Sequence, residues 1–74
     1  MASEEQKKFL LRFGKNLLEL RKKKNLSYRK LAQKCDIDHA DIRKYEKGEI
    51  NMTILTMVEF SKGLEISLKE LMEF

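Results

Sequence analysis

The stretch from Leu26 to Gly48 decides the fold, and it reads Leu-Ser-Tyr-Arg-Lys-Leu-Ala-Gln-Lys-Cys-Asp-Ile-Asp-His-Ala-Asp-Ile-Arg-Lys-Tyr-Glu-Lys-Gly. Ser27 and Asp38 are residue types that accept hydrogen bonds from the free amides at the start of a helix. Apolar residues recur at helical spacing after each of them, and Gly48 is a typical helix stop. Because so few residues separate the two helices, they must cross at a steep angle, and the stretch predicts a helix-turn-helix.

Capping residues predict three more helices. Ser3 caps a first helix that ends in the lysine run before Asn25, which can adopt the left-handed conformation. Thr53 caps a fourth helix that ends toward Gly63, and Ser67 caps a short fifth helix. The absence of proline and the many Leu, Lys and Glu residues favour the same all-α fold of five helices.

Length and composition bound the class of protein. We expect the 74 residues to form a single domain, 1–74, with the motif at about residues 27–47. One cysteine cannot form an intramolecular disulfide, and the apolar runs are too short for a signal peptide or a membrane span. We therefore expect a cytoplasmic protein.

The net charge of +4 is unevenly distributed along the chain. Residues 1–48 hold 14 Lys and Arg against 7 Asp and Glu, whereas residues 49–74 hold 2 against 5. A basic run is often only a solvated surface, but here the basic part also carries the motif. This coincidence favours a nucleic acid as the partner.

The first helix carries more apolar residues than one small core needs. Its expected core stripe is Phe9, Phe13, Leu17 and Leu20. The surplus residues are Leu10, Leu11 and Leu18 on that helix, and Phe74 at the far end of the sequence. We expect either the acidic C-terminal segment or a second subunit to cover the surplus on the helix.

The motif resembles the DNA-reading unit of the lambda-repressor-like (Cro-like, xenobiotic-response-element) family. That family's pattern runs Leu-Ser-Gln-x-x-Leu-Ala, then Gly-Val-Ser, then Ile, then Glu-x-Gly. The matching positions are Leu26, Ser27, Leu31, Ala32, Ile42, Glu46 and Gly48, with Ile37 for the Val and Asp38 as the cap. The likeness extends from Phe13 to Leu71, and it implies a five-helix DNA-binding domain.

Two departures from the family pattern concern backbone conformation. The family usually has a left-handed glycine where this chain has Asp36, and a second one where it has Glu65. We therefore expect both residues to be left-handed, at a cost of about 1 kcal/mol each.

The second helix of the motif carries the candidate base contacts His39, Ala40, Asp41, Arg43 and Lys44. By resemblance, His39, Ala40 and Lys44 stand where base-reading side chains are found. Lys44 could donate to guanine, His39 to guanine or a phosphate, and the Ala40 methyl could touch a thymine methyl. Asp41 could accept from cytosine, or pair with Arg43 or Lys44 and repel wrong sequences. The plain alternative is a solvent-facing side of a helix.

Phosphate contacts are expected at two places. Ser27, Tyr28 and Arg29 lie at the amide end of the motif's first helix, which attracts anions. The family commonly has Gln at the position of Tyr28, and a phenol can also donate to a phosphate oxygen. Lys47 and Asn51 follow the second helix of the motif, which we call the reading helix, and are the second pair of candidate phosphate contacts.

Arg21 and Glu46 stand where the resembled family pairs an Arg with a Glu. A bidentate pair would lock the reading helix onto the first helix and would contribute orientation more than stability. The alternative is two unrelated surface charges.

Nothing in the sequence indicates catalysis. Cys35 is expected to be a small core residue, and Cys35 with His39 is too small a set for a metal site. There is no nucleophile with a base and no glycine-rich phosphate loop. We expect no enzyme activity, no metal and no cofactor.

The leading hypothesis is therefore a sequence-specific transcriptional regulator that reads double-stranded DNA as a homodimer. Dimerisation through the last two helices would place two reading helices about 34 Å apart, one DNA turn. Two alternatives remain: an antitoxin whose main partner is a toxin, or a protein-interaction module. In the antitoxin, the surplus apolar residues would form the contact with the toxin, whereas in the protein-interaction module the basic face would have no role.

Overall fold

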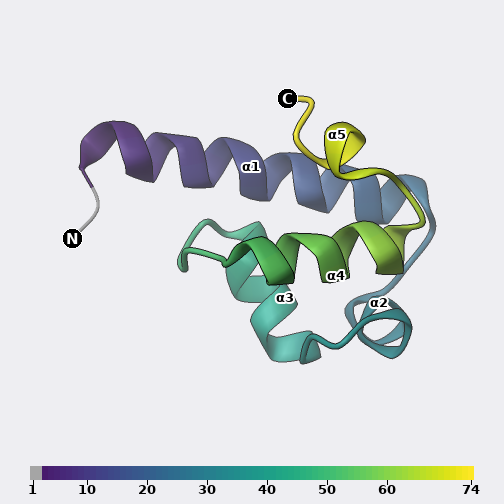
Figure 1. Ribbon diagram of the computed structural model, residues 1–74. Coiled ribbons are helices and arrows are strands. Elements are labelled where there is room, and N and C mark those ends of the chain that lie inside the picture. The colour runs from purple at the N-terminus through teal and green to yellow at the C-terminus, as the bar shows by residue number, and fades with distance from the viewer. Residues whose placement is uncertain (1–2) are drawn as a thin grey trace.

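The computed structural model describes residues 3–74, which form five helices and no strand (Figure 1). The helices are α1 (Glu4–Lys23), α2 (Tyr28–Lys34), α3 (His39–Glu46), α4 (Ile54–Leu64) and α5 (Leu68–Leu71). The predicted all-α fold is confirmed. None of these helices combines the length and the apolar character needed to cross a membrane.

All five predicted capping residues are confirmed. Each accepts a hydrogen bond from a backbone amide of its own first turn, and the residues are Ser3, Ser27, Asp38, Thr53 and Ser67. Ser3 and Gln6 form a reciprocal capping box, with bonds of 3.2 and 2.9 Å. Since such a cap typically contributes about 1 kcal/mol, these local bonds define where each helix begins.

The corners between helices confirm one of the two left-handed predictions. Glu65 ends α4 with a φ of 58°, and Asn25, after α1, has the same value. The prediction for Asp36 is wrong, because Asn25 and Glu65 are the non-glycine residues of positive φ within residues 3–74. Cys35 is extended there, with a φ of −148°, and the Asp36 amide donates to Glu59 Oε1 at 2.8 Å. A side chain of α4 thus holds this corner without a left-handed residue.

Every helix contributes to one core. Its buried apolar residues are Phe13, Leu17, Leu31, Ile42, Phe60, Leu64 and Leu71. The expected stripe on α1 is confirmed for Phe13 and Leu17, whereas Leu20 is half-buried and Phe9 is 48% exposed. The core therefore lies under the C-terminal two thirds of α1, and the first turns of α1 extend beyond the other helices (Figure 1).

The end of α3 lies directly against α1. A Cβ atom at Gly14 would overlap the backbone carbonyl of Glu46, so only glycine permits this approach. Figure 1 shows α2 nearly end-on and α3 beside it in side view, so the axes of the two helices are steeply inclined, as the sequence predicts. The tilt of α3 is thus fixed by α1 at one end and by α2 at the other.

The surplus apolar residues of α1 are covered unequally by the chain itself. Leu10 and Leu18 are half-buried, whereas Leu11 is 56% exposed. Phe74 folds back onto α1, with ring centroids 5.3 Å from Phe9 and 5.7 Å from Phe13. A second exposed apolar surface lies on α4 and comprises Ile54 (72% exposed), Leu55 (76%) and Val58 (38%). We call these three residues the α4 apolar face.

Candidate nucleic-acid interface

The helix α3 has one buried and one exposed side. Ile42 and Glu46 face the interior, whereas the predicted base-contact residues His39, Ala40, Arg43 and Lys44 are exposed and Asp41 is half-buried. This division follows from the helical period, because residues four apart share a face. The outer side of α3 is therefore available to a ligand.

An open cleft of about 440 Å³ runs along this outer side. Its lining residues are Tyr28, His39, Ala40, Arg43, Lys44, Lys47 and Glu49. Four of the five predicted base-contact residues thus meet in one cleft, together with two of the predicted phosphate contacts. Asp41 does not line it.

The remaining predicted phosphate contacts are exposed but lie outside the cleft lining. They are Ser27 and Arg29 at the start of α2 and Asn51 in the segment between α3 and α4. Ser27 Oγ accepts from the Lys30 amide at 3.1 Å, which leaves its hydroxyl proton free to donate. Asn51 Oδ1 accepts from the Met52 amide at 2.9 Å, which leaves its side-chain NH₂ group as the available donor.

The first turn of α3 is organised by Asp38. Its Oδ1 accepts from the Ala40 amide at 3.1 Å and lies 3.3 Å from His39 Nδ1. One carboxylate therefore caps the helix and lies beside the imidazole at its entrance. This leaves Nε2 of His39 as the ring nitrogen free to meet a ligand.

A buried ion pair joins α1 to the end of α3. Arg21 Nε donates to Glu46 Oε2 at 2.6 Å, Nη2 donates to Oε1 at 3.1 Å, and Nη1 donates to the Leu26 carbonyl at 2.8 Å. The hydrogen bond to Glu46 raises the pKa of Arg21 further above its ordinary value, although burial opposes it. The structure thus brings the two residues together in the bidentate geometry that guanidinium and carboxylate favour.

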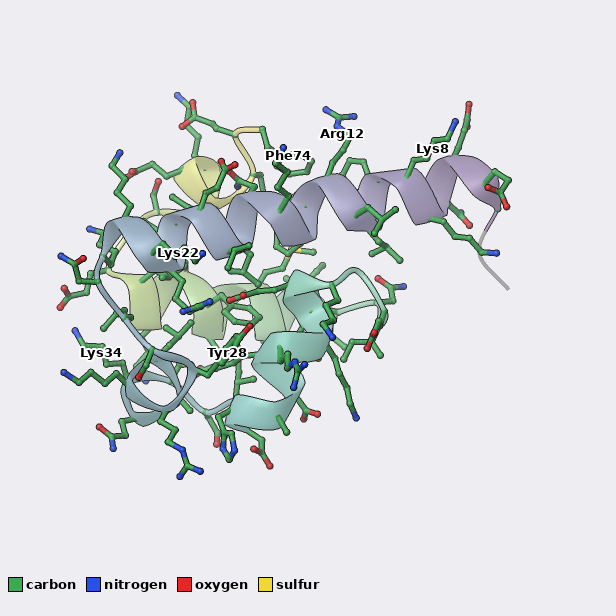
Figure 2. All side chains as sticks on the ribbon, turned by 180° about the vertical axis from the view of Figure 1, so that it is seen from behind. Lys8, Arg12, Lys22, Tyr28, Lys34 and Phe74 are labelled. Carbon is green, nitrogen blue, oxygen red and sulfur yellow. The ribbon has the colours of Figure 1, made fainter. Side chains whose placement is uncertain are left out.

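The ring of Tyr28 lies on this ion pair. Arg21 Cζ lies 4.2 Å from the centroid of the ring, which is cation–π distance. Figure 2 labels Tyr28 where α2 and α3 come together beneath α1. Sequence reasoning missed this contact and also the position of Glu49 on the cleft. The one available signal was the aromatic residue at a position where the resembled family has Gln.

Cys35 packs against the core, as the sequence predicts. Its Sγ donates to the Leu31 carbonyl at 3.2 Å, and burial raises the pKa of the thiol. A thiol of raised pKa is a poor nucleophile at neutral pH, which fits a packing residue.

Comparison with known proteins places the whole arrangement in one family. A model of the helix-turn-helix family matches residues 17–71, which confirms the resemblance drawn from the motif. Control protein C.MunI of Mycoplasma sp is 37% identical over 62 residues, which cover 82% of this chain and 84% of that protein. Control protein C.BamHI of Bacillus amyloliquefaciens is 34% identical over 65 residues, covering 86% and 80% respectively.

Two solved structures share the fold. The restriction-modification controller protein C.AhdI from Aeromonas hydrophila superposes with a TM-score of 0.81 at 32% identity, covering 84% of this chain and 94% of that one. The controller protein C.Esp1396I, solved as a tetramer in complex with its natural 35-base-pair operator, gives a TM-score of 0.74 at 26% identity, covering 86% and 95%. This chain therefore belongs to the helix-turn-helix family that includes these control proteins.

Proposed function

We propose that this protein is a transcriptional regulator, and not an enzyme, that acts as a single DNA-binding domain. Its helix α3 enters the major groove of a two-fold operator, and the protein binds as a homodimer. The observation that carries this proposal is the exposed cationic cleft along α3, whose opposite side is fixed to the core by Ile42 and Glu46. The controller proteins to which the chain is similar, one of them solved on its operator, support the same function.

Each exposed residue of α3 has a role that its chemistry permits. Lys44 donates to guanine O6 and N7, His39 donates to guanine or a phosphate, and the Ala40 methyl meets a thymine methyl. Arg43, in the same cleft, is a further donor. Asp41 is a neighbour of these cations in the sequence but does not line the cleft. Its carboxylate either repels DNA of the wrong sequence or accepts a hydrogen bond from cytosine.

Phosphate contacts flank the reading residues. Ser27, Tyr28 and Arg29 lie on the α2 side of α3, and Lys47 and Asn51 lie beyond its last turn. Contacts on both sides fix the register of a helix in the groove without reading sequence.

The homodimer is proposed to form through α4 and α5. The α4 apolar face is exposed, and Leu68 and Met72 on the C-terminal part are 40% and 38% exposed. A two-fold axis through this surface would cover the apolar side chains with their own copies. One domain reads only half of a site, so a dimer supplies the discrimination that one short helix lacks.

The antitoxin alternative depended on surplus apolar residues of α1 and on Phe74. Of these, Leu10 and Leu18 are half-buried by the chain itself and Phe74 packs on Phe9 and Phe13, so Leu11, at 56%, is the one that stays more than half exposed. No separate protein partner is therefore proposed.

The test is selection of bound fragments from random-sequence duplex DNA, followed by affinity measurements over a range of salt concentrations. We expect enrichment of a two-fold sequence and a steep loss of affinity with ionic strength, because released counterions favour binding. Lys44→Ala should relax the preference at one base position, by about 1–3 kcal/mol of discrimination. Lys47→Ala should weaken all duplexes alike and reduce the salt dependence by about one phosphate contact.

Two outcomes would contradict the proposed function. A purified protein that binds duplex DNA at low ionic strength no better than an uncharged polymer would remove the proposal. Co-purification of a second small protein that blocks the cleft would instead favour the antitoxin alternative.

A further inference from the structure

The aromatic ring of Tyr28 is held rigidly at the edge of the α3 cleft. Arg21 Cζ lies 4.2 Å from the ring centroid, and Arg21 itself is 7% exposed and bound to Glu46 and to the Leu26 carbonyl. The guanidinium is buried and makes three hydrogen bonds, so it offers the ring a fixed surface, and the ring cannot swing away without losing this cation–π contact. Its position is therefore set before any ligand arrives.

The cleft lining combines an aromatic ring and a methyl group with cationic side chains and the carboxylate of Glu49. Tyr28 from α2 and Ala40 from the first turn of α3 line it together, whereas His39, Arg43 and Lys44 supply its donors. Figure 2 shows the Tyr28 side chain on the same side of the molecule as α3. An aromatic ring and a methyl group offer little to a phosphate, which seeks N–H and O–H donors. They offer a favourable surface to a small apolar group.

The major groove presents a single kind of apolar group of that size, the methyl group at C5 of a pyrimidine. Thymine always carries it, and 5-methylcytosine carries the same methyl at the same place. Given the proposed function, in which α3 enters the groove with its first turn toward the base edges, Ala40 would face such a methyl group. Tyr28 would then contact it from the α2 side.

We propose that Tyr28 and Ala40 form a slot for the C5-methyl group of a pyrimidine, so that Tyr28 reads sequence in addition to any phosphate contact of its hydroxyl. The inference rests on the proposed function and deepens it. It assigns a specificity role to a residue of α2, at a position where the resembled family commonly has Gln.

The experiment uses the duplex that the protein enriches from a random library. Each thymine is replaced in turn by deoxyuridine, which keeps base pairing and removes only the methyl group. We expect one position in each half-site at which the Kd rises about fourfold, and about sixteenfold when both halves are changed, since one methyl group leaves the slot per subunit. In a parallel series, each cytosine is replaced by 5-methylcytosine. A position at which this change lowers the Kd about fourfold would identify methylated cytosine as the occupant.

Variants of Tyr28 test whether its aromatic ring causes the change in Kd on removal of the methyl group. We compare the Kd for the duplex without the methyl group with the Kd for the duplex that carries it. Tyr28→Phe should keep this ratio, because the ring remains, whereas Tyr28→Gln should lower it toward one, because only Ala40 then contacts the methyl group. Lys47→Ala, which changes another residue of the same cleft, should weaken both duplexes by the same factor and leave the ratio unchanged. Each ratio compares two duplexes on one protein preparation, so partial loss of folded protein does not alter it.

Three results would overturn the slot while leaving the proposed function intact. These are a selected duplex in which no C5-methyl group affects affinity, a Tyr28→Gln variant that keeps the ratio, and a Tyr28→Phe variant that loses it. Failure to enrich any duplex would instead remove the proposed function, and the slot with it.

Discussion

At the scale of single residues, Arg21 has the largest influence on the candidate interface. Its guanidinium bonds Glu46 at the end of α3, bonds the Leu26 carbonyl before α2, and supports the ring of Tyr28. One side chain of α1 therefore connects the two helices whose residues line the cleft, α2 and α3. Because burying charges costs about as much as their attraction returns, its contribution is orientation more than net stability.

Removing either partner of the ion pair should be more harmful than removing both. Arg21→Ala or Glu46→Ala leaves a buried charge without its counter-ion, and we expect each to lower the free energy of unfolding by about 3–5 kcal/mol. The double variant should lose less than the sum of the single losses. Thermal unfolding and operator affinity, measured on all four proteins, form a double-mutant cycle. A cycle with no coupling in DNA binding would mean that the pair does not orient α3.

At the scale of helices, local interactions set where each helix begins, and contacts between helices set the tilt of α3. Caps fix where each helix starts, but α3 reaches its tilt because Gly14 lets the carbonyl of Glu46 approach α1. The corner between α2 and α3 is held by a hydrogen bond from the Asp36 amide to Glu59 on α4. The reading helix is therefore positioned by three neighbouring helices.

The end of α4 offers a simple gain in stability. Glu65 has a φ of 58°, which favours glycine, so Glu65→Gly should relieve strain and raise the free energy of unfolding by about 0.5–1 kcal/mol, or Tm by a few degrees. The ion pair with Lys34, at 3.9 Å and exposed, adds too little to reverse the sign.

Asn25→Gly is the matched control, because Asn25 has the same φ but is a residue type that tolerates it. We expect a smaller rise in Tm for Asn25→Gly than for Glu65→Gly by differential scanning calorimetry. An unchanged or lower Tm for Glu65→Gly would mean that the left-handed conformation at Glu65 is not strained.

At the scale of the whole molecule, charge and apolar surface occupy different places. Cationic side chains line the cleft along α3, whereas the exposed apolar face is on α4. Of the five acidic residues in 49–74, Glu49 lines the cleft, whereas the other four lie outside its lining and would be away from the DNA on the proposed operator. This separation lets one surface bind DNA while another binds a second copy.

The proposed dimer can be tested at its most exposed leucine. Leu55 is 76% exposed, so Leu55→Glu should leave the subunit folded but place a charge in the interface. We expect the dimer dissociation constant to rise about a hundredfold, since a two-fold axis removes the leucine burial twice. Sedimentation velocity at micromolar concentration would show this shift.

Leu11→Glu serves as the control, because Leu11 is 56% exposed on α1, outside the proposed interface. It should leave the sedimentation coefficient unchanged. If Leu11→Glu dissociates the dimer and Leu55→Glu does not, the interface lies on α1 instead.

The sequence by itself determined the five helices, their first residues and the residues on the outer side of α3. These features depend on capping bonds between residues two or three apart and on the helical period. Both are local, so the sequence alone is enough to predict them. The Arg21 and Glu46 pairing was also foreseen, but from the family pattern and not from spacing.

Only the tertiary structure decided how distant residues meet. It placed Tyr28 on Arg21, gave Asp36 a partner in Glu59 and folded Phe74 onto Phe9. It also left the apolar face on α4 exposed, although the sequence pointed to α1 for a surplus. Such contacts result from packing all the helices together at once, and no local pattern specifies which of several apolar faces remains uncovered.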